Sequence, residues 1–308
     1  METKEYQTII VGSGPAGMTA AIYAQRAKLS ALVIEKDFVS GGQMVKTSEV
    51  DNYPGLPGMG GYEIGETFRA HAEKLGAIFV RENVKKIELE GYRKRVITNK
   101  GEYLAETVIL ATGARHRMLG IPGEEELQGM GVSYCATCDG AFFKDKVAVV
   151  VGGGDVAVED TIFLSRICRQ VYLVHRRSEL RAEKFLQEKV RNLENVKILW
   201  DTVLEEIEGK EQVESVRLKN VHTGETVSLC ADGVFIAVGM IPNTDNFKEL
   251  VEISPEGYIQ AGEDCITSVP GIYAAGDIRT KKLRQIITAA ADGANAVESV
   301  HRYLLSQK

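Results

Sequence analysis

Two cysteines separated by two residues, Cys135 and Cys138, are followed directly by an aspartate, Asp139. A C-x-x-C pair lowers the pKa of one of its thiols, and the thiolate formed attacks disulfides. The adjacent carboxyl group could act as a general acid or base, although an aspartate before Gly140 is also an ordinary turn or cap residue. Zinc would need two more ligands, and the sequence has no second C-x-x-C and no paired histidines, so we expect no metal site. The pattern therefore favours a redox-active dithiol.

Two glycine-rich loops of the same pattern lie on either side of this pair in the sequence. Each follows an apolar strand and precedes a helix, which is the setting that a dinucleotide-binding fingerprint requires. The glycines allow a tight turn and a close approach of the backbone to a pyrophosphate, which the helix N-terminus then faces. The loops are Gly12, Ser13, Gly14, Pro15, Ala16 and Gly17, and Gly152, Gly153, Gly154, Asp155, Val156 and Ala157.

The loops belong to a longer internal repeat. Each repeat continues into short amphipathic strands and ends in a similar apolar strand, at residues 108–113 and 234–239. This pattern predicts an α/β fold with two Rossmann-like dinucleotide-binding domains, each with a small antiparallel strand insertion. We assign residues 1–115 and 246–308 to the first domain, and 116–245, with the C-x-x-C pair, to the second. The positions that match lie 140 residues apart: Gly12, Gly14, Gly17 and Glu35 against Gly152, Gly154, Ala157 and His175.

The repeats differ at the end of their second strand. Glu35 can accept hydrogen bonds from both hydroxyls of an adenosine ribose and would repel a 2′-phosphate. The second repeat has His175, Arg176 and Arg177 there, with Arg181 close by. Guanidinium groups match a phosphate bidentately, so the second site is predicted to bind NADPH in preference to NADH. A solvated basic patch is the alternative interpretation.

A late segment indicates what the first site holds. Gly276 and Asp277 follow an apolar strand, and Arg284, Gln285 and Ile286 open an apolar-periodic helix. A strand-end aspartate can bind a ribityl hydroxyl, and a helix N-terminus can stabilise negative charge on a reduced flavin. Taken alone, Asp277 is more often a turn residue, but the neighbouring arginine and glutamine support a flavin site. We therefore predict that the first site binds FAD.

The composition of the chain limits its partners and its location. Its 308 residues include 37 Lys and Arg against 43 Asp and Glu, a net charge of -6, which argues against non-specific binding to nucleic acid or to an anionic membrane. No apolar run approaches the roughly 18 residues of a membrane helix, and no signal-peptide pattern is visible at the start. Five sparse cysteines indicate a reducing cytoplasm, where a structural disulfide would be unusual. Cys168, Cys230 and Cys265 are expected to be buried as small apolar residues.

Over essentially its whole length the chain resembles the bacterial-type low-molecular-weight thioredoxin reductases. The redox motif and its position are specific to this group, whereas the glycine loops are shared with many flavoproteins. One departure is Val156, where the family usually has a hydroxyl residue that could contact a pyrophosphate. The resemblance is carried by residues 12–17, 41–43, 49–55, 111–114 and 135–140, by His175, Arg176, Arg177 and Arg181, and by Gly276, Asp277, Arg284 and Gln285.

The resemblance implies a homodimer with FAD on the first domain and NADPH on the second, and thioredoxin or a thioredoxin-like protein as substrate. It also implies that Cys138 lies nearer the flavin and that FAD contacts Gly42, Gln43 and Asn52. The alternative is a flavin-dependent NADPH reductase of another small dithiol or electron carrier. The crossovers at about 114–123 and 241–245 could form a double hinge, because the family is described as rotating its domains. The predicted FAD site is completed by Lys36, Val84, Ala111, Thr112 and Gly113.

Overall fold

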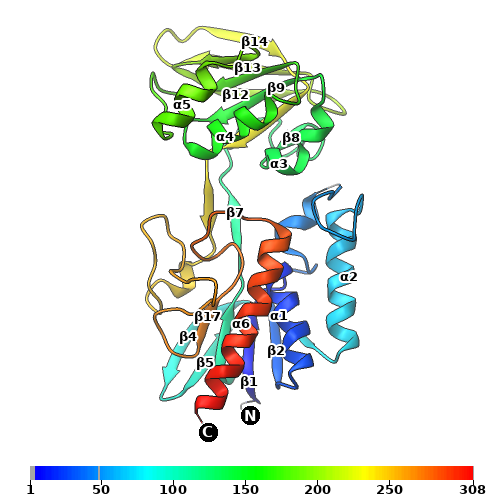
Figure 1. Ribbon diagram of the computed structural model, residues 1–308, viewed down its shortest axis with the longest axis vertical. Coiled ribbons are helices and arrows are strands. Elements are labelled where there is room, and N and C mark those ends of the chain that lie inside the picture. Colours follow the sequence, from blue (N-terminus) through cyan, green and yellow to red (C-terminus); the bar gives the residue numbers. More distant parts are fainter. Residues whose placement is uncertain (1–3, 48, 308) are drawn as a thin grey trace. The chain divides into compact units, whose positions relative to one another are not determined.

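The computed structural model describes residues 4–47 and 49–307, and the chain divides into two compact units (Figure 1). Unit 1 comprises Met1–Arg115 and Ile241–Lys308, and unit 2 comprises His116–Met240. The second boundary therefore falls after Met240, whereas the sequence placed it after residue 245. The predicted class, an α/β fold with two dinucleotide-binding domains, is confirmed.

Unit 1 is built on one mixed sheet with the strands β1 (Lys4–Val11), β2 (Ala31–Glu35), β3 (Ile78–Arg81), β4 (Val84–Glu90), β5 (Arg93–Thr98), β6 (Glu102–Leu110) and β17 (Ile272–Ala274). The parallel part has the order β3-β2-β1-β6, and β17 pairs in parallel with the end of β6. The hairpin of β4 and β5 extends the sheet with antiparallel strands, as the predicted insertion does. The helices described for this unit are α1 (Pro15–Arg26), η1 (Gly42–Lys46), α2 (Gly61–Lys74), η3 (Asp245–Phe247) and α6 (Ile286–Ser306).

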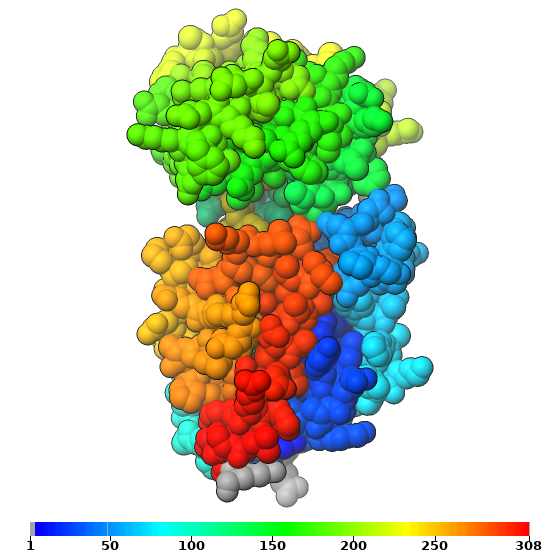
Figure 2. Space-filling view, viewed as in Figure 1, coloured from blue at the N-terminus to red at the C-terminus, as the bar shows by residue number. Residues whose placement is uncertain are grey.

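The sheet of unit 1 is buried on both faces, because successive strand residues point to opposite sides. Ile10 and Val33 pack in one cluster with the alanines of α1 and α6. Their neighbours Ile9 and Leu32 belong to a second cluster, which includes Val84 of β4. In the space-filling view α6, in red, lies at the surface of unit 1 near α1, in blue (Figure 2).

Unit 2 repeats this plan with the parallel strands β8 (Val132–Ser133), β9 (Val147–Gly152), β10 (Gln170–Val174), β11 (Val196–Leu199) and β15 (Gly233–Ala237). Their order is β11-β10-β9-β15-β8, and a separate antiparallel sheet takes the place of the hairpin of unit 1. That sheet consists of β12 (Thr202–Glu208), β13 (Ser215–Asn220) and β14 (Thr226–Cys230). The helices described here are α3 (Ala136–Asp139), η2 (Gly140–Phe143), α4 (Asp155–Leu164) and α5 (Lys184–Arg191). The crossovers contain β7 (Ala114–His116) and β16 (Met240–Pro242), which pair with each other.

The cysteines outside the pair divide into two kinds. Cys168 and Cys265 are buried, as expected, and burial raises their thiol pKa to about 11 and about 12. The expectation for Cys230 is wrong, because this residue is exposed at the end of β14, an outer strand of its sheet. Among the residues that the structure describes, no helix has the length and hydrophobicity needed to cross a membrane.

Candidate active site

The redox pair lies at the start of α3 in unit 2. Cys135 is the residue before this short helix, and the backbone N–H groups of Cys138 and Asp139 donate to its carbonyl at 3.2 and 3.1 Å. This turn brings the Cα atoms of Cys135 and Cys138 to 5.3 Å, and the two sulfurs form a disulfide. Both cysteines are half-buried, while Ala136 between them packs into the core. The structure thus describes the oxidised state of the predicted dithiol.

The carboxyl group of Asp139 is held by a serine that the sequence analysis did not single out. Ser133 ends β8 and is 5% exposed, and its hydroxyl donates to Asp139 Oδ2 at 2.5 Å. The hydroxyl oxygen of Ser133 in turn accepts the backbone N–H of Cys135 at 3.0 Å. Burial raises the pKa of Asp139, and the bond from Ser133 acts in the opposite direction. A strand-end serine carries no sequence signal of its own, because its role depends on the turn that follows.

In unit 1, the glycine loop is shaped as a dinucleotide cradle. Gly12 has φ +107°, and a Cβ there would lie 2.4 Å from the Ala111 carbonyl oxygen. A Cβ on Gly17 would meet the Gly12 carbonyl oxygen at 1.9 Å, so helix α1 packs directly on the loop. Gly14, by contrast, has open space where its Cβ would stand, and it precedes α1 without a side-chain cap. The first N–H groups of α1 are thus available to an anion.

Glu35 lies at the end of β2, as predicted, and forms hydrogen bonds with the first glycine loop. Its Oε2 accepts both the backbone N–H and the hydroxyl of Ser13 at 2.7 Å, and its Oε1 accepts the N–H of Asp37 at 2.9 Å. The Ser13 hydroxyl also lies 2.9 Å from that of Ser40. A carboxylate has about four acceptor positions, so Glu35 retains capacity for a ribose hydroxyl.

Three predicted flavin contacts have buried polar atoms that lack a partner among the described residues. They are Oε1 of Gln43, Oδ1 of Asp277 and Nε of Arg284. Burial raises the pKa of Asp277, and the Arg284 guanidinium lies over the ring of Tyr258 at 4.1 Å. Buried polar groups in proteins are nearly always bonded, so these atoms mark a place where a polar ligand is required. The hydroxyls and ring heteroatoms of FAD fit that need.

Other predicted FAD residues are joined across long stretches of the sequence. Asn52 Nδ2 donates to Gln285 Oε1 at 3.0 Å, directly before α6 begins at Ile286. A Cβ on Gly42, whose φ is +61°, would lie 3.4 Å from the Cα of Gly14, so the two loops meet. The side-chain amide of Asn243, which the sequence analysis did not single out, donates to the carbonyl of Thr112 at 2.8 Å. The backbone N–H of Asn243 donates to the carbonyl of Gly113 at 3.0 Å.

The remaining members of the predicted FAD set differ in their surroundings. Val84 is 4% exposed and packs in the core at the start of β4, so its side chain has a structural role. Ala111 is also buried, beneath the glycine loop. Lys36 is exposed directly after β2, while Pro15 and Ala16 form the first residues of α1. The structure thus gathers most of this set around the carboxyl ends of the parallel strands and the start of α1.

The second glycine loop, in unit 2, has the same construction. A Cβ on Gly152 would lie 2.5 Å from the Ala237 carbonyl oxygen, and the Cβ position of Gly154 is open at the start of α4. A Cβ on Gly153 would lie 2.1 Å from the imidazole of His175, which therefore packs directly against the loop. The side chain of Asp155 accepts the N–H of Glu183 at 2.8 Å, so it ties α4 to the loop before α5.

The predicted phosphate-binding arginines are accessible. Arg176, Arg177 and Arg181 are exposed, and none forms an ion pair with a carboxylate in the part of the chain that the structure describes. His175 is buried beneath them, its Nε2 lies 2.9 Å from the Glu179 carbonyl oxygen, and burial lowers its pKa. Val156 is 59% exposed, so the residue that departs from the family pattern faces solvent. The arrangement suits a ligand phosphate rather than an internal ion pair.

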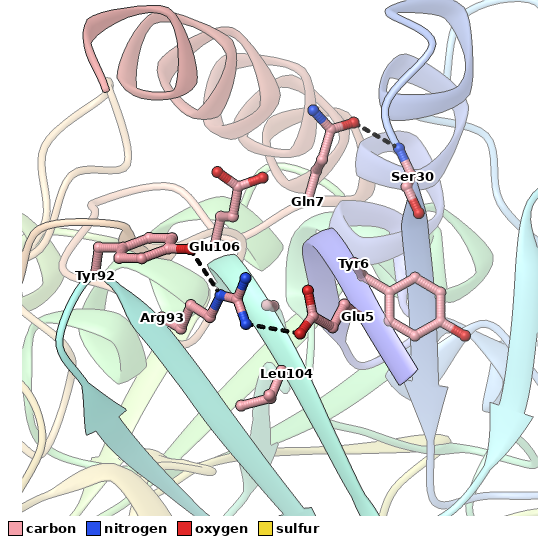
Figure 3. A pocket seen from close by; sticks show the side chains of 9 residues that line it. Glu5, Tyr6, Gln7, Ser30, Tyr92, Arg93, Leu104 and Glu106 are labelled. Carbon is pink, nitrogen blue, oxygen red and sulfur yellow. Dashed lines mark hydrogen bonds and ion pairs between the residues drawn. The ribbon is translucent and has the colours of Figure 1, made fainter. Parts of the chain in front are cut away.

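A pocket of about 270 Å³ lies elsewhere in unit 1, among the residues near the amino end of β1 and the middle of β6 (Figure 3). Arg93 lies between Tyr92 and Glu5 and donates to them at 2.9 and 2.6 Å. Nucleotide sites in such folds lie at the carboxyl ends of the strands, and none of the predicted site residues lines this pocket. We assign it no ligand.

Comparisons with known proteins agree with this geometry. The family model of the pyridine nucleotide-disulphide oxidoreductases matches residues 6–293. The thioredoxin reductase of Bacillus subtilis (strain 168) is 47% identical over 305 residues, which cover 98% of this chain and 96% of the relative. That of Listeria innocua is 46% identical over 305 residues, 98% of this chain and 95% of the relative. The crystal structure of thioredoxin reductase from Streptococcus pyogenes MGAS5005 matches with a TM-score of 0.94 at 47% identity, over 99% of this chain and 100% of that chain.

The chain belongs to the pyridine nucleotide-disulphide oxidoreductase family. The two relatives and the solved structure are all thioredoxin reductases, and they span nearly its full length. The predicted class, an NADPH-dependent flavoprotein oxidoreductase with FAD and NADPH as cofactors, is therefore confirmed.

Proposed function

We propose that this chain is a thioredoxin reductase, which passes electrons from NADPH through FAD and the Cys135–Cys138 pair to the disulfide of thioredoxin or a similar small protein. The observation that carries the proposal is the disulfide at the start of α3, with the buried carboxyl group of Asp139 bonded to Ser133 beside it. The assignment of thioredoxin as the substrate rests on the thioredoxin reductases that the chain resembles along nearly its full length.

The chemistry at the sulfur pair follows from its surroundings. FAD, when bound, supplies two electrons that it has received from NADPH. Two electrons break the Cys135–Cys138 bond and leave a thiolate and, after a proton arrives, a thiol. We assign Asp139 to supply and later remove that proton, since its raised pKa suits a group that changes protonation. From the family resemblance, Cys138 is the sulfur nearer the flavin.

The dithiol then reduces its partner by exchange. One thiolate of the pair attacks a sulfur of the partner disulfide, which forms a mixed disulfide and releases a thiolate on the partner. The other cysteine attacks the mixed disulfide, so that the Cys135–Cys138 bond forms again and the partner leaves with both electrons. Both cysteines are half-buried, so a second protein that docks beside α3 could reach their sulfurs.

The two cofactors would be held by different units. In unit 1 we assign the pyrophosphate of FAD to the Gly12–Ala16 loop, the adenosine ribose to Glu35 and the ribityl chain to Asp277. Gln43 and Arg284, with their buried unpartnered atoms, would bind polar groups of the flavin half. The other predicted FAD contacts stand as proposals: Lys36, Gly42, Asn52, Val84, Ala111, Thr112, Gly113, Gly276, Gln285 and Ile286.

In unit 2 we assign the NADPH pyrophosphate to Gly152, Gly154 and the start of α4. The 2′-phosphate would lie on Arg176, Arg177 and Arg181, which are exposed and have no competing carboxylate among the described residues. His175 shapes the loop through Gly153, and Asp155 holds the next helix in place.

The finer features that the resemblance implies remain part of the proposal. We propose a cytoplasmic homodimer of this two-domain chain. The dithiol and the nicotinamide must each reach the flavin, so we propose that the two crossovers act as a double hinge. Thioredoxin, and neither nucleic acid nor a membrane, is the partner that this account requires.

An anaerobic NADPH titration of the FAD-loaded protein tests the proposal. The wild-type protein should take up twice the reducing equivalents of a variant that carries Cys135→Ser and Cys138→Ser, because the disulfide accepts one further electron pair. Equal uptake would remove the dithiol from the path and favour a flavin-dependent NADPH reductase of another carrier. A thioredoxin-coupled assay of the same two proteins then shows whether electrons reach the partner.

A further inference from the structure

A buried cluster of charged residues lies behind the flavin site of unit 1, outside the contacts assigned above. Its centre is Asp292 on α6, whose side chain is 5% exposed. The side chains of Arg279 and Lys281, in the segment between β17 and α6, are each 7% exposed. Charged side chains are almost never buried to this degree unless they are paired, and even buried pairs add little stability. The cluster is therefore expected to have a role other than stabilising the fold.

Three residues of the segment between β17 and α6 donate hydrogen bonds to the carboxylate of Asp292. Arg279 donates from Nε to Oδ2 at 2.9 Å and from Nη2 to Oδ1 at 2.7 Å, which is a bidentate pair. Lys281 Nζ donates to Oδ2 at 2.8 Å. The backbone N–H of Gly276 donates to the same oxygen at 2.8 Å. Burial works to raise the pKa of Asp292, but the bonds from Arg279 and Lys281 outweigh it and lower the pKa below its usual value.

The bond to Gly276 links this cluster to the cofactor site. Gly276 directly precedes Asp277, whose buried Oδ1 lacks a partner among the described residues. Gly276 has φ +81°, and a Cβ there would lie 2.9 Å from the Cβ of Ala16 in the first turn of α1. The neighbour of Asp292, Gly293, packs equally closely, since its Cβ would lie 2.2 Å from the Ala16 carbonyl oxygen. The turn before Asp277 is thus fixed between α6 and α1, the helix that follows the pyrophosphate loop.

We propose that Asp292 is a positioning residue of the FAD site, which holds the Gly276–Asp277 turn so that the Asp277 carboxylate faces the ribityl chain. Arg279 and Lys281 hold Asp292 in turn, and Arg279 also donates to the carbonyls of Ala261 and Thr280 at 3.3 and 3.0 Å. This inference rests on the proposed function in one respect, the assignment of the ribityl chain to Asp277.

The test is a comparison of FAD and ADP binding to the full-length apo-protein at a temperature where every variant is folded by circular dichroism. ADP contains the adenosine and pyrophosphate of FAD but no ribityl chain, so it reports on the Gly12–Ala16 loop and Glu35 and not on Asp277. Asp292→Asn should raise the Kd for FAD about tenfold or more, because a charge-assisted bond to the turn is lost, and leave the Kd for ADP nearly unchanged. Glu298→Gln, an exposed change on the same helix, is the matched control and should alter neither value.

A merely structural role for Asp292 gives a different result. It would lower the melting temperature of the apo-protein while FAD binding stayed within about twofold of wild type, or it would weaken FAD and ADP equally, and either outcome overturns the inference. A wild-type protein that binds no FAD would instead overturn the proposed function. If Asp292→Asn does not fold, the triple variant Arg279→Met, Lys281→Met, Asp292→Leu removes the buried charges together, which cores often tolerate. It should show the same selective loss of FAD affinity, and equal affinity for FAD in this variant and wild type would refute the role.

Discussion

The two nucleotide-binding units share the construction of their glycine loops and differ in what surrounds them. The first glycine of each loop touches a carbonyl of the neighbouring strand, with Cβ positions 2.4 Å from Ala111 and 2.5 Å from Ala237. Gly14 and Gly154 both leave open space at the start of a helix. The fingerprint therefore fixes the cradle for a pyrophosphate but does not choose the nucleotide.

We propose that the nucleotide is chosen by the residues at the end of the second strand and by the buried polar atoms of the site. Glu35 bonds to its own loop through Ser13, while His175 packs against Gly153 and leaves the arginines after it exposed. The buried polar atoms without a partner among the described residues all belong to unit 1. This contrast fits a resident cofactor enclosed by unit 1 and a substrate that enters and leaves unit 2.

The largest effect is expected from the first glycine of each loop. Gly12→Ala forces a Cβ to 2.4 Å from a backbone carbonyl at φ +107°, where neither atom can move easily. We expect a loss of about 3 kcal/mol in the unfolding free energy and no retention of FAD after purification. The measurement is the flavin absorbance of the purified protein and its thermal unfolding. Gly14→Ala, with open space at its Cβ, should fold normally, and equal destabilisation by both changes would contradict the close approach.

The same change in unit 2 should separate the two sites. Gly152→Ala, whose Cβ would lie 2.5 Å from the Ala237 carbonyl oxygen, should abolish reduction by NADPH. The yellow FAD-loaded form should persist, because the FAD site lies in unit 1. Flavin reduction by dithionite compared with reduction by NADPH measures this. Loss of flavin from the Gly152→Ala protein would show that the two sites are not independent.

The arginines of unit 2 should give the next largest effect, and a selective one. Removal of Arg176 and Arg177 takes away charge-assisted bonds to a phosphate, each worth roughly 1.5–3 kcal/mol, so the KM for NADPH should rise at least tenfold. The KM for NADH, which lacks that phosphate, should change little. Steady-state kinetics of Arg176→Ala, Arg177→Ala with both nucleotides make the test, and Arg166→Ala is a control elsewhere on unit 2. Equal effects on NADPH and NADH would rule out the assignment.

Glu35 in unit 1 is the counterpart of these arginines, and its replacement should have a smaller effect. Glu35→Gln keeps one acceptor for Ser13 but loses the charge that draws in two donors at 2.7 Å, so FAD should bind several-fold more weakly. Titration of the apo-protein with FAD measures the change. Asp37→Asn, two residues away and outside the loop, serves as the control. An unchanged Kd would mean that Glu35 supports neither the loop nor the ribose.

The sequence was sufficient to predict those features that depend on residues close together in the chain. The two-domain α/β class followed from the repeated loops at Gly12 and Gly152, because strand, loop and helix are adjacent in the chain. NADPH followed from Arg176 and Arg177, and FAD from Asp277 with its neighbours. What could not be foreseen are contacts made by distant segments. Asn52 meets Gln285 across 233 positions, and no local pattern announces this bond.

Two further discrepancies have the same physical origin. Cys230 was expected to be buried by its residue type, but its exposure depends on β14 having no strand on its outer side in the three-stranded order. Ser133 and Asp292 were not predicted from the sequence, because neither belongs to a motif. Each instead bonds to a motif residue, Asp139 or Gly276. Sequence patterns reveal the groups that contact ligands more readily than those that hold such groups in place.

The smallest effect should be a shift along the pH axis at the redox pair. Asp139 has a pKa above its ordinary value because it is buried, and the bond from Ser133 moderates that rise by stabilising the ionised form. If Asp139 delivers a proton in the step that limits turnover, activity falls as pH rises through its pKa. Ser133→Ala removes the bond, so the pKa should rise further and the falling limb should move to higher pH.

The pH profile of the thioredoxin-coupled rate measures this shift, and a second carboxyl group makes a control necessary. Asp160 on α4 also has a raised pKa, about 7, because of burial and the neighbouring Glu159, so it is a second candidate for the group behind the falling limb. Asp160→Asn should leave the limb in place, whereas Asp139→Asn should abolish it together with most of the activity. If the falling limb vanishes in Asp160→Asn and does not move in Ser133→Ala, Asp139 is not the acid of the limiting step. The bond of 2.5 Å between Ser133 and Asp139 would then have no role in proton delivery.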